Sequence, residues 1–196
     1  MAMDEVVERS GASAASNKWV GVYVGILAVL LAICNVGGSN ATKDAMRAHI
    51  EAANTWSFYQ AKNIRRNTTT IAADDLELMQ QAMPAMSAEL QQKFQSKIAD
   101  YRAEVQRLTT DPEKKEGMNE LMARGRHLEG DRDTAFRKDP YFDWSQALLQ
   151  IAIVLASVHL IVNNGLLLAM SGLLAAGGIL LMVNGFTLLV HLPFLS

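Results

Sequence analysis

Side chains that can bind metals gather at one point of this chain, where His127, Glu129, Asp131 and Asp133 stand at alternate positions. Imidazole and carboxylate groups hold zinc or calcium when a characteristic spacing brings them together. Residues two apart on a helix point in different directions, so these four side chains are more typical of a solvated charged face. We therefore expect no metal site and no cofactor.

The other candidates for chemistry are weaker. Residues 117–119 read Gly-Met-Asn, the tripeptide that marks the pore of large magnesium channels, but there it follows a membrane span directly and here it lies in a hydrophilic helix. Lys62, Arg65 and Arg66 form a basic cluster that is more typical of a helix face paired with acids than of an anion site. No Gly-rich phosphate loop or nucleophile motif is present. We therefore expect a protein that is not an enzyme.

The distribution of charge indicates a membrane protein. Half of the 196 residues are hydrophobic, and residues 144–196 contain no Asp, Glu, Lys or Arg. Because a helix needs about 20 residues to cross a bilayer, this stretch crosses twice, over residues 144–162 and 166–189, with a turn at 163–165. An earlier uncharged run supplies a first transmembrane helix over residues 19–38.

Between the first and second spans lies a polar domain, residues 39–143, with 16 of the 18 Lys and Arg residues and 17 of the 20 acids. This near balance gives no basic surface for nucleic acid, so we expect none as a partner. The apolar residues recur at helical spacing. The predicted fold is an all-α membrane protein, with three transmembrane helices and a long helical coiled-coil domain between the first and second. Residues 1–18 and 190–196 are expected to be tails.

The first helix of the polar domain is expected over residues 41–81, with Ser39, Asn40 or Thr42 as its cap. Its predicted apolar face is Met46, Ile50, Ala53, Trp56 and Ile64. Since the chain must return to the membrane, we favour a long antiparallel hairpin of helices that projects from the bilayer. A break of this helix at residues 67–70 is the alternative, because Asn and Thr favour caps over helix interiors.

Two more helices should complete the return. One, over residues 88–108, has apolar residues three and four apart, as in a coiled-coil seam: Leu90, Phe94, Ile98, Tyr101, Val105 and Leu108. The other starts with Asp111 as its cap and Pro112 in its first turn. Its predicted apolar face is Met118, Leu121, Gly125, Leu128 and Ala135.

A new helix is expected to begin where the chain re-enters the bilayer, since Asp139 can cap it and Pro140 fits its first position. Aromatic residues near the ends of transmembrane helices anchor them at the membrane interface. The predicted anchors are Trp19, Tyr23, Tyr141, Phe142 and Trp144.

Small residues recur four or seven apart in the spans, a spacing that lets helices approach closely within one chain or between copies. They are Gly21, Gly25, Ala28, Ala32, Gly172, Ala176, Gly178 and Gly185. The notable polar residues are His159, His191, Gln146, Gln150 and Asn184. The last three are candidates for interhelical hydrogen bonds or for a pore shared by several copies. The absence of Asp, Glu, Lys and Arg from the spans argues against a proton-coupled pump.

The first span is expected to be an uncleaved anchor. Cys34 ends a stretch like the lipoprotein cleavage box, but Ile33 stands where a small residue is needed and the preceding tail carries Asp4, Glu5 and Glu8. Basic residues near the spans are more numerous on the side of the polar domain, which favours a cytoplasmic location for it: Lys43, Arg47, Arg132, Arg137 and Lys138, against Arg9 and Lys18.

Several segments of the chain resemble one bacterial family of small membrane proteins, the family catalogued as domain of unknown function 4337. They are residues 17–19, 27–34, Trp56 with 58–65, 139–143 and 147–157. The similarity runs from about residue 17 to residue 186. The resemblance implies a multi-pass protein of the bacterial inner membrane with this order of spans, and it carries no catalytic residue across.

Two functions are open at this point. The first is a structural or scaffolding protein in the lipid bilayer, a homo-oligomer whose projecting cytoplasmic helices bind partner proteins or organise the membrane. The alternative is an oligomeric channel for ions or small solutes. Polar residues that could line a pore are sparse, so we favour the scaffold.

Overall fold

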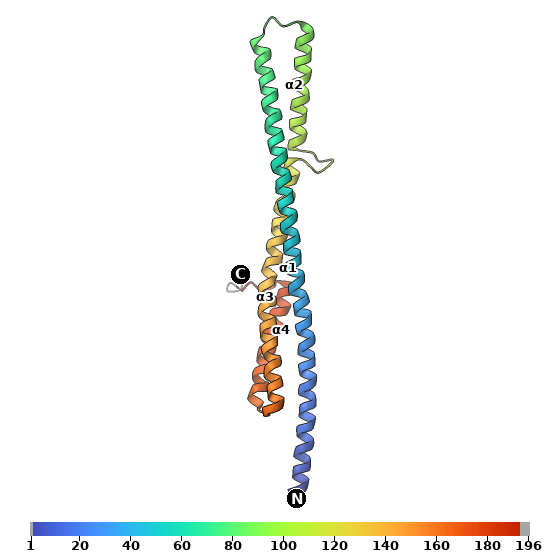
Figure 1. Ribbon diagram of the computed structural model, residues 1–196, viewed down its shortest axis with the longest axis vertical. Coiled ribbons are helices and arrows are strands. Elements are labelled where there is room, and N and C mark those ends of the chain that lie inside the picture. The colour runs from blue at the N-terminus through green and yellow to red at the C-terminus, as the bar shows by residue number, and fades with distance from the viewer. Residues whose placement is uncertain (1, 193–196) are drawn as a thin grey trace. The chain divides into compact units, whose positions relative to one another are not determined.

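The structure, a computed structural model, describes residues 2–192, with side chains from residue 18 onward. These residues form four helices and no strand (Figure 1): α1 (Ala2–Ala82), α2 (Ala88–Thr109), α3 (Met118–Val162) and α4 (Gly165–Thr187). Three of the helices, α1, α3 and α4, contain stretches long and apolar enough to cross a membrane. The predicted all-α class and three candidate spans are therefore confirmed.

The helices form two compact units. The spanning unit consists of the chain up to Ala45 and from Asp133 onward, and the polar unit runs from Met46 to Arg132. Each unit is described by itself.

The expected helix start at Ser39, Asn40 or Thr42 is wrong, because α1 continues through these residues. The hydroxyl of Thr42 donates to the carbonyl of Gly38, one turn back in the same helix, at 3.1 Å. The alternative break at residues 67–70 does not occur either. Thr68, Thr69 and Thr70 donate to carbonyls four residues back at 3.0, 2.9 and 2.9 Å. A Thr hydroxyl satisfied in this way can remain inside a helix.

The helix predicted over residues 88–108 is present as α2, and Ser87 caps it by accepting from the Leu90 N–H at 3.4 Å. The predicted start of the following helix at Asp111 is wrong, since α3 begins at Met118. The Asp111 carboxylate accepts from the N–H of Lys114 at 3.1 Å, and Lys115 adopts a left-handed φ of 56°. Asp111 therefore stabilises a turn in place of a helix end.

The predicted helix start at Pro140 is also wrong, because Pro140 lies inside α3. Its missing N–H leaves the helix one hydrogen bond short. Asp139, expected to cap a new helix, instead lies 3.0 Å from the hydroxyl of Thr42 on α1 and shares its one proton with the carbonyl of Gly38.

The chain breaks between α3 and α4 at residues 163 and 164, within the predicted turn of residues 163–165, and Gly165 is already the first residue of α4. Asn163 has a φ of 52°, a left-handed conformation that Asn tolerates. The side chain of Asn164 caps α4 by accepting from the N–H of Leu166 at 3.0 Å. The backbone carbonyl of Asn164 contacts Nδ1 of His159 at 2.9 Å. The turn is thus fixed from both sides.

Buried positions on α1 recur every seven residues in the spanning unit. They are Val20, Leu27, Cys34 and Ala41. A seven-residue repeat keeps one face of a helix turned toward its neighbours along its whole length. The buried residues of α3 and α4 in this core are Phe142, Leu149, Ala152, Ala175 and Met182.

In the polar unit, α1 runs antiparallel to the returning chain, as its contacts and Figure 1 show. Arg102 on α2 binds Asp74 and Glu77 on α1 at 2.6 and 2.9 Å. The hydrogen bonds that the Arg102 guanidinium donates to Glu77 and Asp74 raise the pKa of Arg102. Further along the return, Trp56 on α1 donates to Glu129 on α3 at 3.0 Å. Residue numbers fall along α1 as those of its partners rise, as expected of an antiparallel hairpin.

Candidate functional site

Glycines pack closely around the ring of Phe142 in the spanning unit. A Cβ atom on Gly37 would lie 2.6 Å from Cε1 of Phe142, and one on Gly185 would lie 3.1 Å from the same atom. The ring of Phe186 meets that of Phe142 edge to face, with centroids 4.9 Å apart. Only glycine leaves room for both rings against α1.

Gly37 and its neighbour Gly38 are not among the packing residues predicted from the sequence. The available signal is two consecutive glycines inside an apolar helix, each of which lowers helix propensity by about 1 kcal/mol relative to Ala. In the structure, Phe142 packs against both, since a Cβ on Gly38 would lie 3.1 Å from its Cβ.

Hydroxyl groups join the helices of the spanning unit. Ser145 donates to the carbonyl of Gly178 at 2.7 Å, and Ser171 donates to the carbonyl of Ala152 at 2.7 Å. The Tyr23 hydroxyl lies 3.1 Å from the Ser171 oxygen. In a bilayer, these bonds would satisfy polar groups that hydrocarbon leaves unpaired.

The predicted small residues divide into two groups. Gly178 and Gly185 are buried within the chain, where Gly178 would place a Cβ 3.0 Å from Leu149. The other six are exposed: Gly21, Gly25, Ala28, Ala32, Gly172 and Ala176. Nothing lies within 4 Å of a Cβ built on Gly21, Gly25 or Gly172. Contacts of these six with a second copy stay a prediction.

Asn184 and Tyr141 hold the segment that follows α4. The side chain of Asn184 both donates to and accepts from the backbone of Val190, at 2.8 and 2.9 Å. The Tyr141 hydroxyl donates to the Val190 carbonyl at 3.1 Å and accepts from the Leu192 N–H at 3.0 Å. Asn184 therefore serves a local turn in this chain, which differs from the pore role considered for it.

The five predicted interface anchors differ in exposure. Trp19 and Trp144 are exposed, as an anchor must be, and Tyr23 is half-buried. Tyr141 and Phe142 are buried, so their rings pack within the protein and differ from the expectation of surface anchors. Of the two glutamines, Gln146 is half-buried and Gln150 is exposed.

Along the predicted seam of α2, burial increases from the start of the helix to its end. Leu108 is buried, Phe94, Ile98, Tyr101 and Val105 are half-buried, and Leu90 is exposed. The apolar face predicted for the third helix is found on α3, where a Cβ on Gly125 would lie 2.9 Å from the Trp56 ring. Trp56 thus packs on a glycine.

The charged candidates pair with neighbours. His127 contacts Asp131 at 2.9 Å one turn along α3, and Glu129 accepts from Trp56. No group of three or more His, Cys, Asp and Glu side chains suited to a metal is found among the described residues.

In the polar unit, α1 has two opposite faces. A buried or half-buried face follows a repeat of three and four residues: Ala48, Ala52, Thr55, Tyr59, Lys62, Arg66, Thr69, Ala73, Leu76 and Gln80. Beside it, Trp56, Asn63, Thr70, Ala72 and Glu77 are half-buried as well. A second repeat of the same kind is exposed and is called here the outer stripe: Ser57, Ala61, Ile64, Thr68, Ile71, Asp75, Leu78 and Ala82. Because each residue turns the helix by about 100°, Ile64 lies about 160° from Lys62 and from Arg66, almost opposite both.

The outer stripe has the larger aliphatic side chains. Ile64, Ile71 and Leu78 are seven residues apart and remain 67, 60 and 62% exposed. The buried face has small or polar residues at most positions, with Leu76 as its one large aliphatic residue. A helix of a water-exposed domain normally shows the reverse distribution. The stripe is therefore the candidate functional surface of this unit.

Comparison with known proteins gives one match. A family model described as domain of unknown function (DUF4337) matches residues 16–188. No curated protein and no solved structure matches the chain.

Proposed function

Because this chain belongs to the family of the domain of unknown function DUF4337, a description that assigns no activity, we propose a function from the surface that the chain leaves uncovered. The protein is a non-enzymatic membrane scaffold whose copies associate along the outer stripe of α1. It lies in the inner membrane of a bacterium, with the polar unit in the cytoplasm, where the assembled helices bind partner proteins. The observation that carries the proposal is the exposure of Ile64, Ile71 and Leu78 at seven-residue spacing.

A second copy is the occupant that best fits this spacing. Copies in one bilayer share one topology, so their α1 helices run parallel. Two parallel helices with the same seven-residue repeat can pair each residue of the stripe with its own counterpart, which makes a symmetric interface. Burying one Ile or Leu side chain contributes about 1.5–3 kcal/mol.

The polar residues of the stripe are compatible with such pairing. Ser57 and Thr68 turn their hydroxyls back to carbonyls of α1, at 2.9 and 3.0 Å, so neither needs a partner across the interface. Asp75 is the one charged residue of the eight. A single polar residue in a seam typically costs stability and fixes the alignment of the two helices.

The mass of the full chain in mild detergent tests this proposal. Light scattering corrected for bound detergent should give at least twice the chain mass of 21.5 kDa. The mass should fall on dilution, as expected for reversible association. A single-chain mass at every concentration would contradict self-association.

Gln150 is the observation that favours the channel as a second candidate. Its side chain is exposed on α3, and it makes no hydrogen bond within the described part of the chain. An unpaired amide in hydrocarbon is costly, so a shared polar axis is one way to satisfy it. Ion flux into liposomes that contain the protein would favour the channel, whereas tight liposomes would favour the scaffold.

A further inference from the structure

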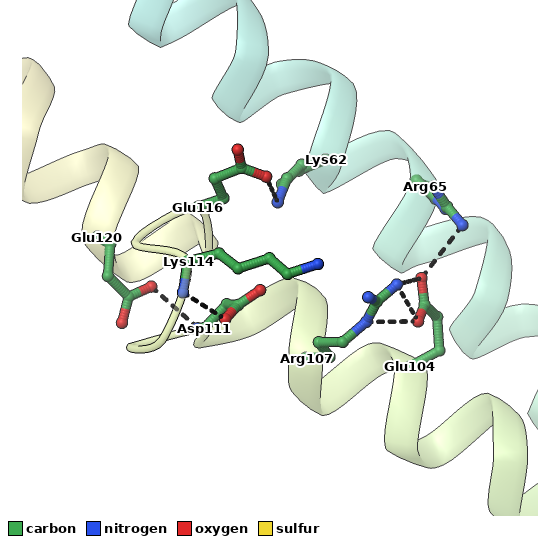
Figure 2. A network of polar contacts seen from close by, with 8 residues as sticks. All are labelled: Lys62, Arg65, Glu104, Arg107, Asp111, Lys114, Glu116 and Glu120. Atoms are coloured by element: carbon green, nitrogen blue, oxygen red, sulfur yellow. Dashed lines mark hydrogen bonds and ion pairs between the residues drawn. The ribbon is translucent and has the colours of Figure 1, made fainter.

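A pocket lies in the polar unit where α1, the end of α2 and the loop after α2 meet (Figure 2). Its volume is about 320 Å³, the size of a site for a small molecule. Phe58, Ala61 and Leu108 give it an apolar wall. The pocket is separate from the outer stripe except at Ala61.

Basic side chains outnumber acidic ones around this pocket. Four basic residues line it, Lys62, Arg65, Arg107 and Lys114, together with two acidic ones, Asp111 and Glu116. The lining residues therefore have an excess of two positive charges, and the carboxylate of Glu104, which contacts Arg65 and Arg107, reduces the excess around the pocket to one. The basic residues come from three separate segments of the chain, so the fold, and not a run of sequence, brings them together.

Two of these cations lack strong partners. The Lys62 side chain is only 15% exposed, and its nearest carboxylate, on Glu116, is 3.8 Å away, beyond hydrogen-bonding distance. Its ammonium also lies 5.0 Å from the centre of the Phe58 ring. The ammonium of Lys114 makes no ion pair within the described residues and extends into the space between α1 and α2 in Figure 2.

The two arginines share one carboxylate. Glu104 contacts Arg107 at 2.8 Å and Arg65 at 3.2 Å. One carboxylate offers two oxygens to two guanidinium groups, which have five N–H donors each. Some N–H groups of Arg65 and Arg107 therefore remain to donate to a further acceptor.

Hydrogen bonds hold the loop that carries Lys114. Asp111 accepts from the Lys114 N–H at 3.1 Å, and its own N–H donates to Glu120 at 3.2 Å. Asn119 donates to the Thr110 hydroxyl at 2.7 Å. The pocket is thus formed before any ligand arrives, which lowers the cost of binding.

We propose that this pocket binds the phosphate group of a phosphate monoester, with Lys62, Lys114 and the two arginines as its ligands and the organic part against Phe58. A phosphate monoester is strongly anionic at neutral pH, which complements the net positive charge around the pocket. Arginine forks and lysine ammonium groups are the side chains that bind phosphate oxygens best. The ester is either a free metabolite or a lipid headgroup.

Titration calorimetry of the full chain in nanodiscs of uncharged lipid tests the site. Adenosine 5′-monophosphate should bind saturably, inorganic phosphate more weakly, and uncharged adenosine not at all. Lys114→Ala should weaken the binding by roughly tenfold or more, since it removes a charge-assisted contact. Lys93→Ala removes the same charge from a residue of α2 that does not line the pocket, and it should change the affinity by less than about twofold.

Titration of the same sample with short-chain phosphatidic acid distinguishes a lipid headgroup from a free phosphate ester as the ligand. Binding of phosphatidic acid alone, lost in Lys114→Ala, assigns the site to a lipid headgroup. Binding of the nucleotide, lost in the same variant, assigns it to a free phosphate ester. The proposal is overturned if none of these probes binds saturably, or if Lys93→Ala weakens binding as much as Lys114→Ala.

Discussion

Gly37→Leu should sharply destabilise the packing of the spanning unit, whereas Gly25→Leu in the same helix should leave it nearly unchanged. A Cβ on Gly37 would lie 2.6 Å from Phe142 and 2.8 Å from Phe186, before the rest of a leucine is added. Inserting atoms into such a contact costs about 1–3 kcal/mol or more. Nothing lies within 4 Å of a Cβ on Gly25.

The two variants can be compared by adding sodium dodecyl sulfate to the protein in mixed micelles and following its fluorescence and circular dichroism. Gly37→Leu should unfold at a clearly lower detergent fraction than the wild type. If the two variants unfolded at the same detergent fraction, the close packing of Phe142 on Gly37 would be contradicted. The protein is kept dilute, so that an effect of Gly25→Leu on association between copies does not alter the unfolding midpoint.

The double substitution Ile64→Glu with Ile71→Glu should convert the assembled protein into single chains. Two aliphatic side chains per copy leave the interface, a loss of about 3 kcal/mol or more, and negative charges then face each other across it. The dissociation constant should therefore rise by about a hundredfold or more. Light scattering at fixed protein concentration measures the change.

A matched control has the same added charge at another place. Gln92→Glu with Gln95→Glu changes two exposed residues of α2. It should leave the mass of the assembly as in the wild type. Far-ultraviolet circular dichroism should be the same for both double variants, so that a change of mass reports association and not unfolding. Equal dissociation by both pairs would argue against the outer stripe.

Helices and spans follow closely from the sequence, but their ends do so less well. Asn163 and Asn164 lie in the predicted turn, because left-handed dihedrals are a local property of Asn. Thr42 and Pro140 do not mark the start of a helix, although both residue types often do. At Thr42 the contacts decide, because its hydroxyl is shared between the Gly38 carbonyl of the same helix and the Asp139 carboxylate on α3. A local pattern does not contain that information.

The same limit applies to the candidate site. Gly25 and Gly178 both belong to small-residue repeats, yet Gly178 is buried and Gly25 is exposed, because packing depends on which neighbour supplies a bulky side chain. The sequence predicts Trp56 and Ile64 on one apolar face of α1. The structure separates them, since Trp56 packs on Gly125 and Ile64 faces outward. Only the positions of α2 and α3 decide which repeat becomes the outer stripe.

Disulfide formation at Ile71→Cys in native membranes tests the proposed self-association most directly. Parallel pairing of the outer stripe brings the two copies of residue 71 together, within reach of a disulfide. The native Cys34 is buried, so the wild type sets the background. Mild oxidation should give a cross-linked dimer from Ile71→Cys but not from Gln92→Cys on the exposed face of α2. Absence of cross-linking at residue 71, or equal cross-linking at both positions, would contradict association along the outer stripe.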